Sequence, residues 1–278
     1  MNERIDTFPL QAATAPAQAR WSATLRLAIV LAAVLLATGL IGMVSGSLPF
    51  ARAADAPSGN YLKYNGGDNG TFTESPVVYL IFYGNQWGGN GGDTQRAAEG
   101  FLKGLGTGGE TWSRTLTQYC TGQPAGTRTC PDNAQHIPYP DGRVFGGTWF
   151  DDAAPATDTM DWEGIGHAAA DHFNAGAALS RSIFVVLSPT PTAGGGNGWH
   201  TTLNGYNIIN LPSNENNTVV LSHEYAEAMT DVNGGWTSPS NEEIADMCGP
   251  GGDLQLPTGS FPVTSLWSNS ANACSMGS

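Results

Sequence analysis

The stretch that most constrains the fold is residues 218–248, where an apolar run leads directly into a set of charged side chains. The segment TVVLSHEYAEAMTD predicts a helix of about three turns, capped at its start by Asn216 or Asn217 and stopped by the Asn-Gly-Gly at 233–235. Carboxylates spaced three or four residues apart on one helix face repel one another, and a bound cation would turn that repulsion into coordination. At 3.6 residues per turn, one face carries Val220, His223, Glu224, Glu227 and Asp231.

His223 and Glu227 lie one turn apart, so both could bind one metal ion, with Glu224 beside it as general base. The spacing resembles the HExxH signature of zinc hydrolases, with Glu in place of the second His. Carboxylate is an accepted zinc ligand, so this replacement is compatible with a metal site. The alternative is a solvated acidic helix face, because short HExxE matches often arise by chance.

A third ligand is expected from a second short helix over residues 241–246. Glu242 and Glu243 are four and three residues before Asp246, so either Glu could share a face with it. A Glu ligand on a downstream helix, with an Asp that holds a ligand His, resembles the thermolysin-like zinc peptidases. Glu243 would equally fit a capping box with Ser240, which is a purely structural role.

Another candidate precedes the main helix. Residues 199–203 and 206–211 alternate in polarity around Asn204-Gly205, which predicts a hairpin with a two-residue turn. This hairpin leads into the helix and carries His200, which would serve as an extra ligand or a substrate-facing donor. A half-exposed strand histidine without such a role is the alternative.

The amino terminus predicts export. Residues 27–44 are almost wholly apolar, and Ala51-Arg52-Ala53 follows as a small-x-small cleavage pattern. We expect residues 1–53 to be a secretory signal, with an uncleaved membrane anchor as the alternative. Either way the rest of the chain would be extracellular, with residues 54–75 as an extended lead-in and residues 76–278 as one domain.

The charge excludes some partners. Outside residues 1–53, which hold four basic and two acidic residues, 7 basic and 22 acidic side chains give a formal charge of −15. Such a surface repels nucleic acid and anionic lipid, so nucleic acid is not an expected partner and a membrane is expected only through an uncleaved N-terminal segment.

The chain has four cysteines, all after residue 53. An even number in an exported chain predicts two disulfides out of three possible pairings. We expect Cys120–Cys130, which closes a short loop, and Cys248–Cys274, which ties the carboxyl-terminal tail to the acidic segment. A zinc site built from all four cysteines is the weaker alternative, because no Cys-x-x-Cys pair is present.

Apolar runs predict buried strands at residues 76–83 and 182–187. Asp93 or Thr94 can cap a helix that runs to about Leu105, and helical spacing also appears over 111–120 and 161–175. His167 and Asp171, one turn apart on the last helix, more simply form a surface hydrogen bond than a metal site. The order predicts a single α/β or α+β domain with a mixed sheet flanked by helices, and a zincin-like helix after a hairpin.

Several segments together resemble the phosphate-induced protein 1 (EXORDIUM-like) family of secreted proteins, in its bacterial form. The matching stretches are VVYLIFYGNQW at 77–87, SIFVVLS at 182–188, His200, SHEYAEAMTD at 222–231, GGW at 234–236 and EIADMC at 243–248. The resemblance implies that Glu243 and Asp246, rather than Glu242, form the downstream pair. The chain departs from plant members before His200, where they have cysteines and this chain has Gly198-Trp199, so the bracing of the hairpin must differ. The family is associated with the extracellular matrix and growth control, which implies a compartment but no reaction.

The leading hypothesis is a secreted zinc hydrolase that acts on a peptide or cell-wall substrate. In it His223, Glu227 and Glu243 hold the metal, Glu224 takes a proton from bound water, and Asp246 orients His223. The alternative is a non-catalytic extracellular protein that binds Ca²⁺ or carbohydrate, because oxygen-rich ligation suits Ca²⁺.

Overall fold

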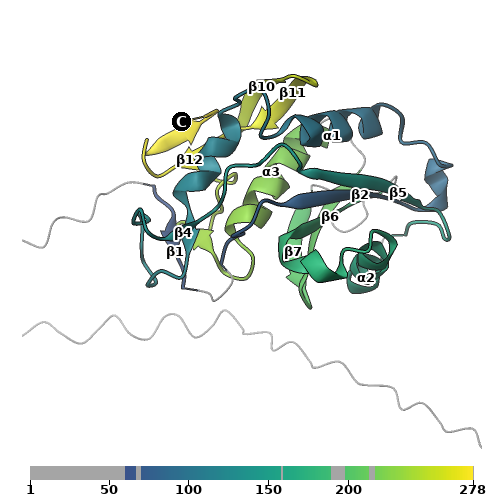
Figure 1. The fold of residues 1–278 in the computed structure, drawn as a ribbon, viewed down its shortest axis with the longest axis horizontal. Helices are drawn as coiled ribbons and strands as arrows, with labels where there is room; N and C mark the ends of the chain where they lie inside the picture. Colours follow the sequence, from purple (N-terminus) through teal and green to yellow (C-terminus); the bar gives the residue numbers. More distant parts are fainter. Residues whose placement is uncertain (1–59, 67–69, 158, 189–197, 213–216, 278) are drawn as a thin grey trace, which may run out of the picture. The chain divides into compact units, whose positions relative to one another are not determined.

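Five strands form a mixed sheet at the centre of the fold (Figure 1). The structure is a computed structural model, and it describes residues 60–66, 70–157, 159–188, 198–212 and 217–277. The strand order is β5-β2-β6-β8-β7. Four strands run parallel, and the edge strand β7 pairs antiparallel with β8. The predicted mixed sheet is confirmed. The strands are β2 (Val77–Tyr83), β5 (Phe145–Asp151), β6 (Ser182–Ser188), β7 (Trp199–Leu203) and β8 (Tyr206–Pro212).

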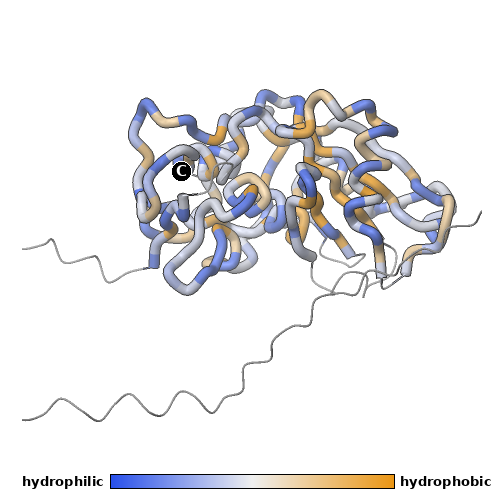
Figure 2. The backbone as a smooth tube through the Cα atoms, turned by 90° about the horizontal axis from the view of Figure 1, so that it is seen from below, coloured by the Kyte–Doolittle hydropathy of each residue, from blue (hydrophilic) through white to orange (hydrophobic). Residues whose placement is uncertain are grey.

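The central strands are apolar on both sides because both faces of the sheet are covered. Every residue of β6 is buried, as its continuous apolar run predicts. Successive side chains point to opposite faces, so Leu80 and Val185 enter the main core whereas Ile81 and Phe184 enter a smaller core on the other face. Figure 2 shows the hydrophobic residues concentrated along these strands.

Helices cover the two faces. Helices α1 (Gly92–Gly104) and α3 (Asn217–Thr230) supply residues to the main core, and α2 (Trp162–His172) supplies them to the smaller cores. Asp161 caps α2 by accepting a hydrogen bond from the Gly164 amide at 3.0 Å. The N-cap of α1 is Gly91 without a side-chain bond, so the predicted capping by Asp93 or Thr94 is wrong. Within the described ranges, three short 3₁₀ helices connect these elements, at Asn85–Trp87, Trp112–Gln118 and Gly176–Arg181.

The segment predicted as a lead-in contributes to the fold. Strand β1 (Lys63–Tyr64) pairs with β9 (Trp236–Thr237), just after the end of α3, and Leu62 and Phe72 are buried in the main core. Residues Ala56–Ser278 form one compact unit. The predicted leader at 1–53 lies outside the described residues. Among the residues described, no helix combines the length and apolar character that a bilayer span requires.

Both predicted disulfides are present. Cys120–Cys130 links β3 (Cys120–Thr121), which pairs with β4 (Gln135–His136), to the loop between them. Cys248–Cys274 joins the acidic segment to the last strand, β13 (Ala273–Ser275), which pairs with β12 (Leu266–Ser268). Between Cys248 and Cys274 in the sequence, β10 (Pro250–Leu256) and β11 (Gly259–Thr264) form a hairpin that packs on α3. Thr218 at the start of α3 donates to the Pro262 carbonyl of this hairpin at 2.7 Å, and therefore helps to fix the helix.

The end of α3 is held by a close backbone approach at Gly235. Asp231 accepts hydrogen bonds from the amides of Asn233 and Gly235, at 3.3 and 2.8 Å. A Cβ on Gly235 would collide with the backbone carbonyl oxygens of Thr230 and Gly70. Only glycine therefore lets the turn pack between the helix end and the amino-terminal segment.

We predict that Gly235→Ala lowers the free energy of unfolding by about 1–3 kcal/mol, because backbone must shift to make room for the methyl group. The matched control is Gly249→Ala, where an added Cβ meets nothing within 4 Å. Chemical denaturation of both variants measures the difference. Equal stability of the two variants would contradict the packing described.

Candidate functional site

Helix α3 presents three polar side chains to one pocket. His223, Glu224 and Glu227 follow the apolar residues Val219 and Val220, which line the same pocket. The exposed fractions are 5% for Glu224 and 3% for Glu227. Burial of a carboxylate costs free energy unless charge or hydrogen bonds compensate it. The predicted helix is confirmed, and the acidic face lies in a pocket and not on an open surface.

Strand β7 brings His200 to the same place. In the hairpin, His200 pairs with Ile209 of β8, and the turn residues Asn204 and Gly205 both have positive φ, 47° and 88°, as the two-residue turn predicts. The His200 side chain is 11% exposed. Because β8 leads to α3 along the chain, the hairpin places this imidazole beside the helix.

The third segment carries Glu243 and Asp246. The predicted helix over 241–246 is wrong: residues 241–243 have no regular structure, residues 244–247 form a turn, and Asn241 has a φ of 66°, outside the helical region. The Ser238 side chain accepts hydrogen bonds from the amides of Ser240 and Glu242, which holds the start of this segment in a non-helical conformation. The segment orients its two acids because the two residues between them are anchored in the main core. Ile244 and Ala245 are fully buried in the main core, and the Ile244 carbonyl accepts a hydrogen bond from the Trp267 amide at 2.9 Å.

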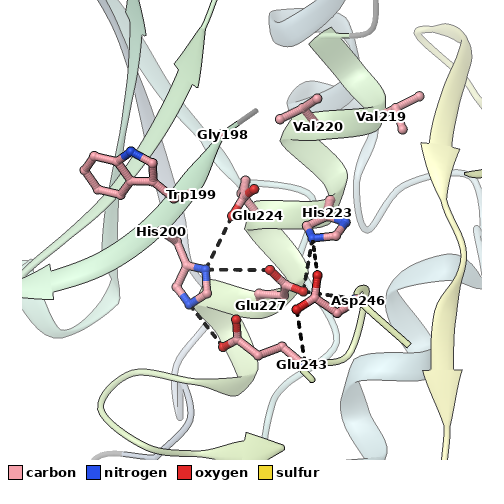
Figure 3. A pocket seen from close by; sticks show the side chains of 10 residues that line it. All are labelled: Gly198, Trp199, His200, Val219, Val220, His223, Glu224, Glu227, Glu243 and Asp246. Atoms are coloured by element: carbon pink, nitrogen blue, oxygen red, sulfur yellow. Dashed lines mark hydrogen bonds and ion pairs between the residues drawn. The ribbon is translucent and has the colours of Figure 1, made fainter. Parts of the chain in front are cut away.

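The six side chains converge (Figure 3). Nδ1 of His200 lies 3.4 Å from Glu224 Oε2 and 3.8 Å from Glu227 Oε2, and its Nε2 lies 3.5 Å from Glu243 Oε1. Nε2 of His223 lies 3.1 Å from Glu227 Oε1 and 3.4 Å from Asp246 Oδ1. The Asp246 amide also donates to Glu227 Oε1 at 3.2 Å, which ties the turn segment to the helix.

Four carboxylates therefore share two imidazoles. In the part of the chain that the structure describes, every ion pair of these carboxylates is with His200 or His223. Even with both histidines protonated, four ionised carboxylates would leave the pocket with an excess of negative charge. The pocket is thus electrostatically suited to a cation.

The protonation of the cluster reflects this excess. Burial raises the pKa of Glu243 to about 8, with the charges of Glu227 and Asp231 adding to the effect and that of His200 opposing it. Burial likewise raises the pKa of Glu227. Burial disfavours the imidazolium of His200, but the hydrogen bond to Glu224 and the charges of Glu243 and Glu227 raise its pKa to about 8.

His223 follows the same pattern. Burial again acts against the charged form, whereas the hydrogen bond to Glu227 and the surrounding carboxylates raise the pKa of His223 to about 9. The surrounding negative charges favour a bound proton on these side chains, and they would favour a bound cation for the same reason.

The pocket has a volume of about 380 Å³. Trp199, Val219 and Val220 provide its apolar wall. Gly198 also lines it, with a φ of 88°, and a Cβ there would lie 2.6 Å from Val220 Cγ1 and 3.0 Å from Glu224 Oε1. Glycine at this position lets the start of β7 approach α3. Sequence reasoning assigned no site role to Gly198, and its signal was only the departure from the plant pattern.

All six predicted site residues line this pocket. The structure groups them as His200-Glu227-Glu243 and His223-Glu227-Asp246, and in each group one ligand atom per residue lies within 4.8 Å of the others. The predicted ligand set of His223, Glu227 and Glu243 draws on both groups. Asp246 contacts His223 through Nε2, the nitrogen that also faces Glu227, and not through the other ring nitrogen that an orienting partner would hold.

Three other candidates do not line the pocket. His167 Nδ1 and Asp171 Oδ2 are 3.4 Å apart on the exposed side of α2, a surface contact as expected. Asp231 caps the turn after α3 and does not line the pocket. Glu242 is exposed and accepts hydrogen bonds from Ser238 and Ser240, so it is separate from the cluster.

We predict that the metal-free protein loses stability as the pH rises from about 5 to about 9. The folded pKa values of His200, His223, Glu227 and Glu243 are all raised, so the folded state binds more protons than the unfolded chain in this window. The stabilisation is fully present below the unfolded pKa values and is lost as the pH passes the folded ones. Denaturant titrations in the presence of a chelator measure it, and Glu243→Gln should reduce the slope below about pH 8. A stability that rises with pH in this window would contradict the assignment.

Comparisons with known proteins add no relative. No protein-family model, no curated sequence and no solved structure matches the chain. The resemblance to the phosphate-induced protein 1 family therefore stays a prediction that rests on its motifs. The functional argument rests on the geometry of the pocket.

Proposed function

We propose that the protein is a secreted metal-dependent hydrolase that acts on peptide bonds. The observation that carries the proposal is the convergence of two imidazoles and four carboxylates, from three separate segments, on one pocket without a basic side chain paired to them among the described residues. A purely structural cluster would gain stability from lysine or arginine partners or from exposure to water. Two nearly buried glutamates have neither.

The donor set fits zinc better than calcium. Imidazole nitrogen and carboxylate oxygen are both ordinary zinc ligands, whereas Ca²⁺ takes six to eight oxygen ligands. In the group that most resembles a zinc-hydrolase helix, His223 and Glu227 would bind the cation from successive turns of α3. Asp246 or Glu243 would complete the protein ligands. Zinc bound there would act as a Lewis acid and acidify a bound water molecule.

In this proposal Glu224 is the general base. It precedes Glu227 by one helical turn, lines the pocket and contacts His200 through Oε2. It would accept a proton from the attacking water as the water oxygen bonds to the substrate carbonyl carbon. The same proton would pass to the amide nitrogen as the C–N bond breaks, which leaves a carboxylic acid and an amine.

The edge strand supports a peptide substrate. Strand β7 is the last strand of the sheet and carries Trp199 and His200 at the pocket. An extended peptide added beside such an edge would gain main-chain hydrogen bonds and place one peptide group near the site. Secretion, which the leader at 1–53 predicts, is consistent with the two disulfides and gives access to extracellular or cell-wall peptides.

We predict that Glu224→Gln retains the bound metal but hydrolyses an unfolded protein substrate at least about 100-fold more slowly, because the general base is lost. His223→Ala should lose both metal and activity. Glu242→Gln is the matched control, since Glu242 neighbours Glu243 but lies outside the pocket. Elemental analysis and release of new amino groups, with and without a chelator, give the two readouts.

The competing function is a non-catalytic extracellular protein that binds Ca²⁺, because carboxylate oxygens are also calcium ligands. Bound calcium in place of zinc, together with hydrolysis that neither a chelator nor Glu224→Gln changes, would reject the hydrolase and favour the binding protein.

A further inference from the structure

The two oxygens of Glu227 face different histidines. Oε1 lies 3.1 Å from His223 Nε2, and Oε2 lies 3.8 Å from His200 Nδ1. A carboxylate that directs one oxygen to each of two nitrogen donors has the geometry of a bridging ligand. We propose that the pocket binds two divalent first-row cations, such as Zn²⁺ or Mn²⁺, and that Glu227 bridges them. This inference rests on the proposed metal-dependent function and specifies its metal centre.

The halves of the pocket offer equivalent donor sets. One half has His223, Glu227 Oε1 and Asp246, and the other has His200, Glu227 Oε2 and Glu243. Each half therefore supplies one imidazole nitrogen and two carboxylate oxygens. Three protein ligands leave room on each cation for water or substrate, which is the arrangement of a catalytic site and not of a closed structural one.

Charge balance favours two cations over one. With neutral imidazoles and ionised carboxylates, the four acids carry four negative charges, which one divalent cation would only half neutralise. In the described ranges no lysine or arginine is paired with these carboxylates. Two divalent cations would neutralise the four carboxylates, with Glu224 included. Uncompensated charge is costly here because Glu224 and Glu227 are almost fully removed from water.

The turn segment that carries Glu243 and Asp246 fixes where the ligands lie. Glu227 Oε1 accepts the Asp246 amide at 3.2 Å, so the bridging carboxylate is fixed by the turn that carries the ligands of both halves. Glu243 and Asp246 are separated by the buried Ile244 and Ala245, which direct one acid to each histidine. Cations bridged by one carboxylate in hydrolases lie about 3.5–4 Å apart, and the pocket volume of about 380 Å³ accommodates such a pair together with substrate atoms.

Glu224 is the carboxylate outside both groups. Its Oε2 lies 3.4 Å from His200 Nδ1, the nitrogen that also faces Glu227 Oε2, so it would lie beside the second cation without being one of its ligands. Glu224 therefore stays available as the base while the other three acids coordinate. The paired centre thus deepens the proposed hydrolase without changing its proton acceptor.

The test measures the number of metal ions bound per molecule of the purified protein. The metal-free protein is loaded with Zn²⁺, dialysed and analysed for metal per chain. We expect two equivalents in the unaltered protein and in Glu242→Gln. Asp246→Asn and Glu243→Gln should each retain one equivalent, and Glu227→Gln should weaken both sites at once. Circular dichroism confirms that each variant is folded, and only folded variants are compared.

A second measurement reports the spacing directly. Mn²⁺ loaded at two equivalents should give the electron paramagnetic resonance spectrum of a spin-coupled pair, which Asp246→Asn should convert to that of isolated ions. One equivalent in the unaltered protein, or two uncoupled ions, overturns the paired centre but leaves the hydrolase proposal standing. No tightly bound metal at all overturns both.

Discussion

The carboxylate of Glu227 is removed from water inside the protein and held between two imidazoles, and the rest of the pocket is arranged around it. An ionised carboxylate in this environment is unstable without positive charge close by. His200, His223 and the amide of Asp246 provide partial compensation. The raised pKa of Glu227 shows that burial still outweighs these partners. The pocket is therefore electrostatically suited to a cation.

The scaffold brings together three segments that are separate in the sequence. The β7–β8 hairpin carries one imidazole, α3 carries the other, and the turns after β9 carry the remaining acids. Each segment is fixed by core packing or covalent bonds. Ile244 anchors the turns, Gly235 closes the end of α3, and Cys248–Cys274 ties the acidic segment to the carboxyl-terminal strand. Preorganisation of this kind means that ligand positions do not depend on flexible surface loops.

The outcome of sequence reasoning differed between regular and irregular regions. The strands β2 and β6 and the helices α2 and α3 were predicted because apolar periodicity is a local property of the chain. The predicted helix at 241–246 was wrong because Asn241 adopts positive φ and Ser238 organises a turn there. The segment predicted as helix at 111–120 is the 3₁₀ helix Trp112–Gln118. Both differences arise where side-chain hydrogen bonds and tertiary packing outweigh weak helix propensity.

The sequence by itself determined the participants: spacing and composition named the His-Glu-x-x-Glu helix, the acidic segment after it, His200 and the cysteine pairs, and the family resemblance selected Glu243 over Glu242. Only the tertiary structure decided how they combine. Which histidine faces which acid depends on the angle between β7, α3 and the turn segment, and this angle is fixed by packing between residues far apart in the chain. Local periodicity carries no information about it. The division of the cluster into two groups that share Glu227 is therefore a property of the fold.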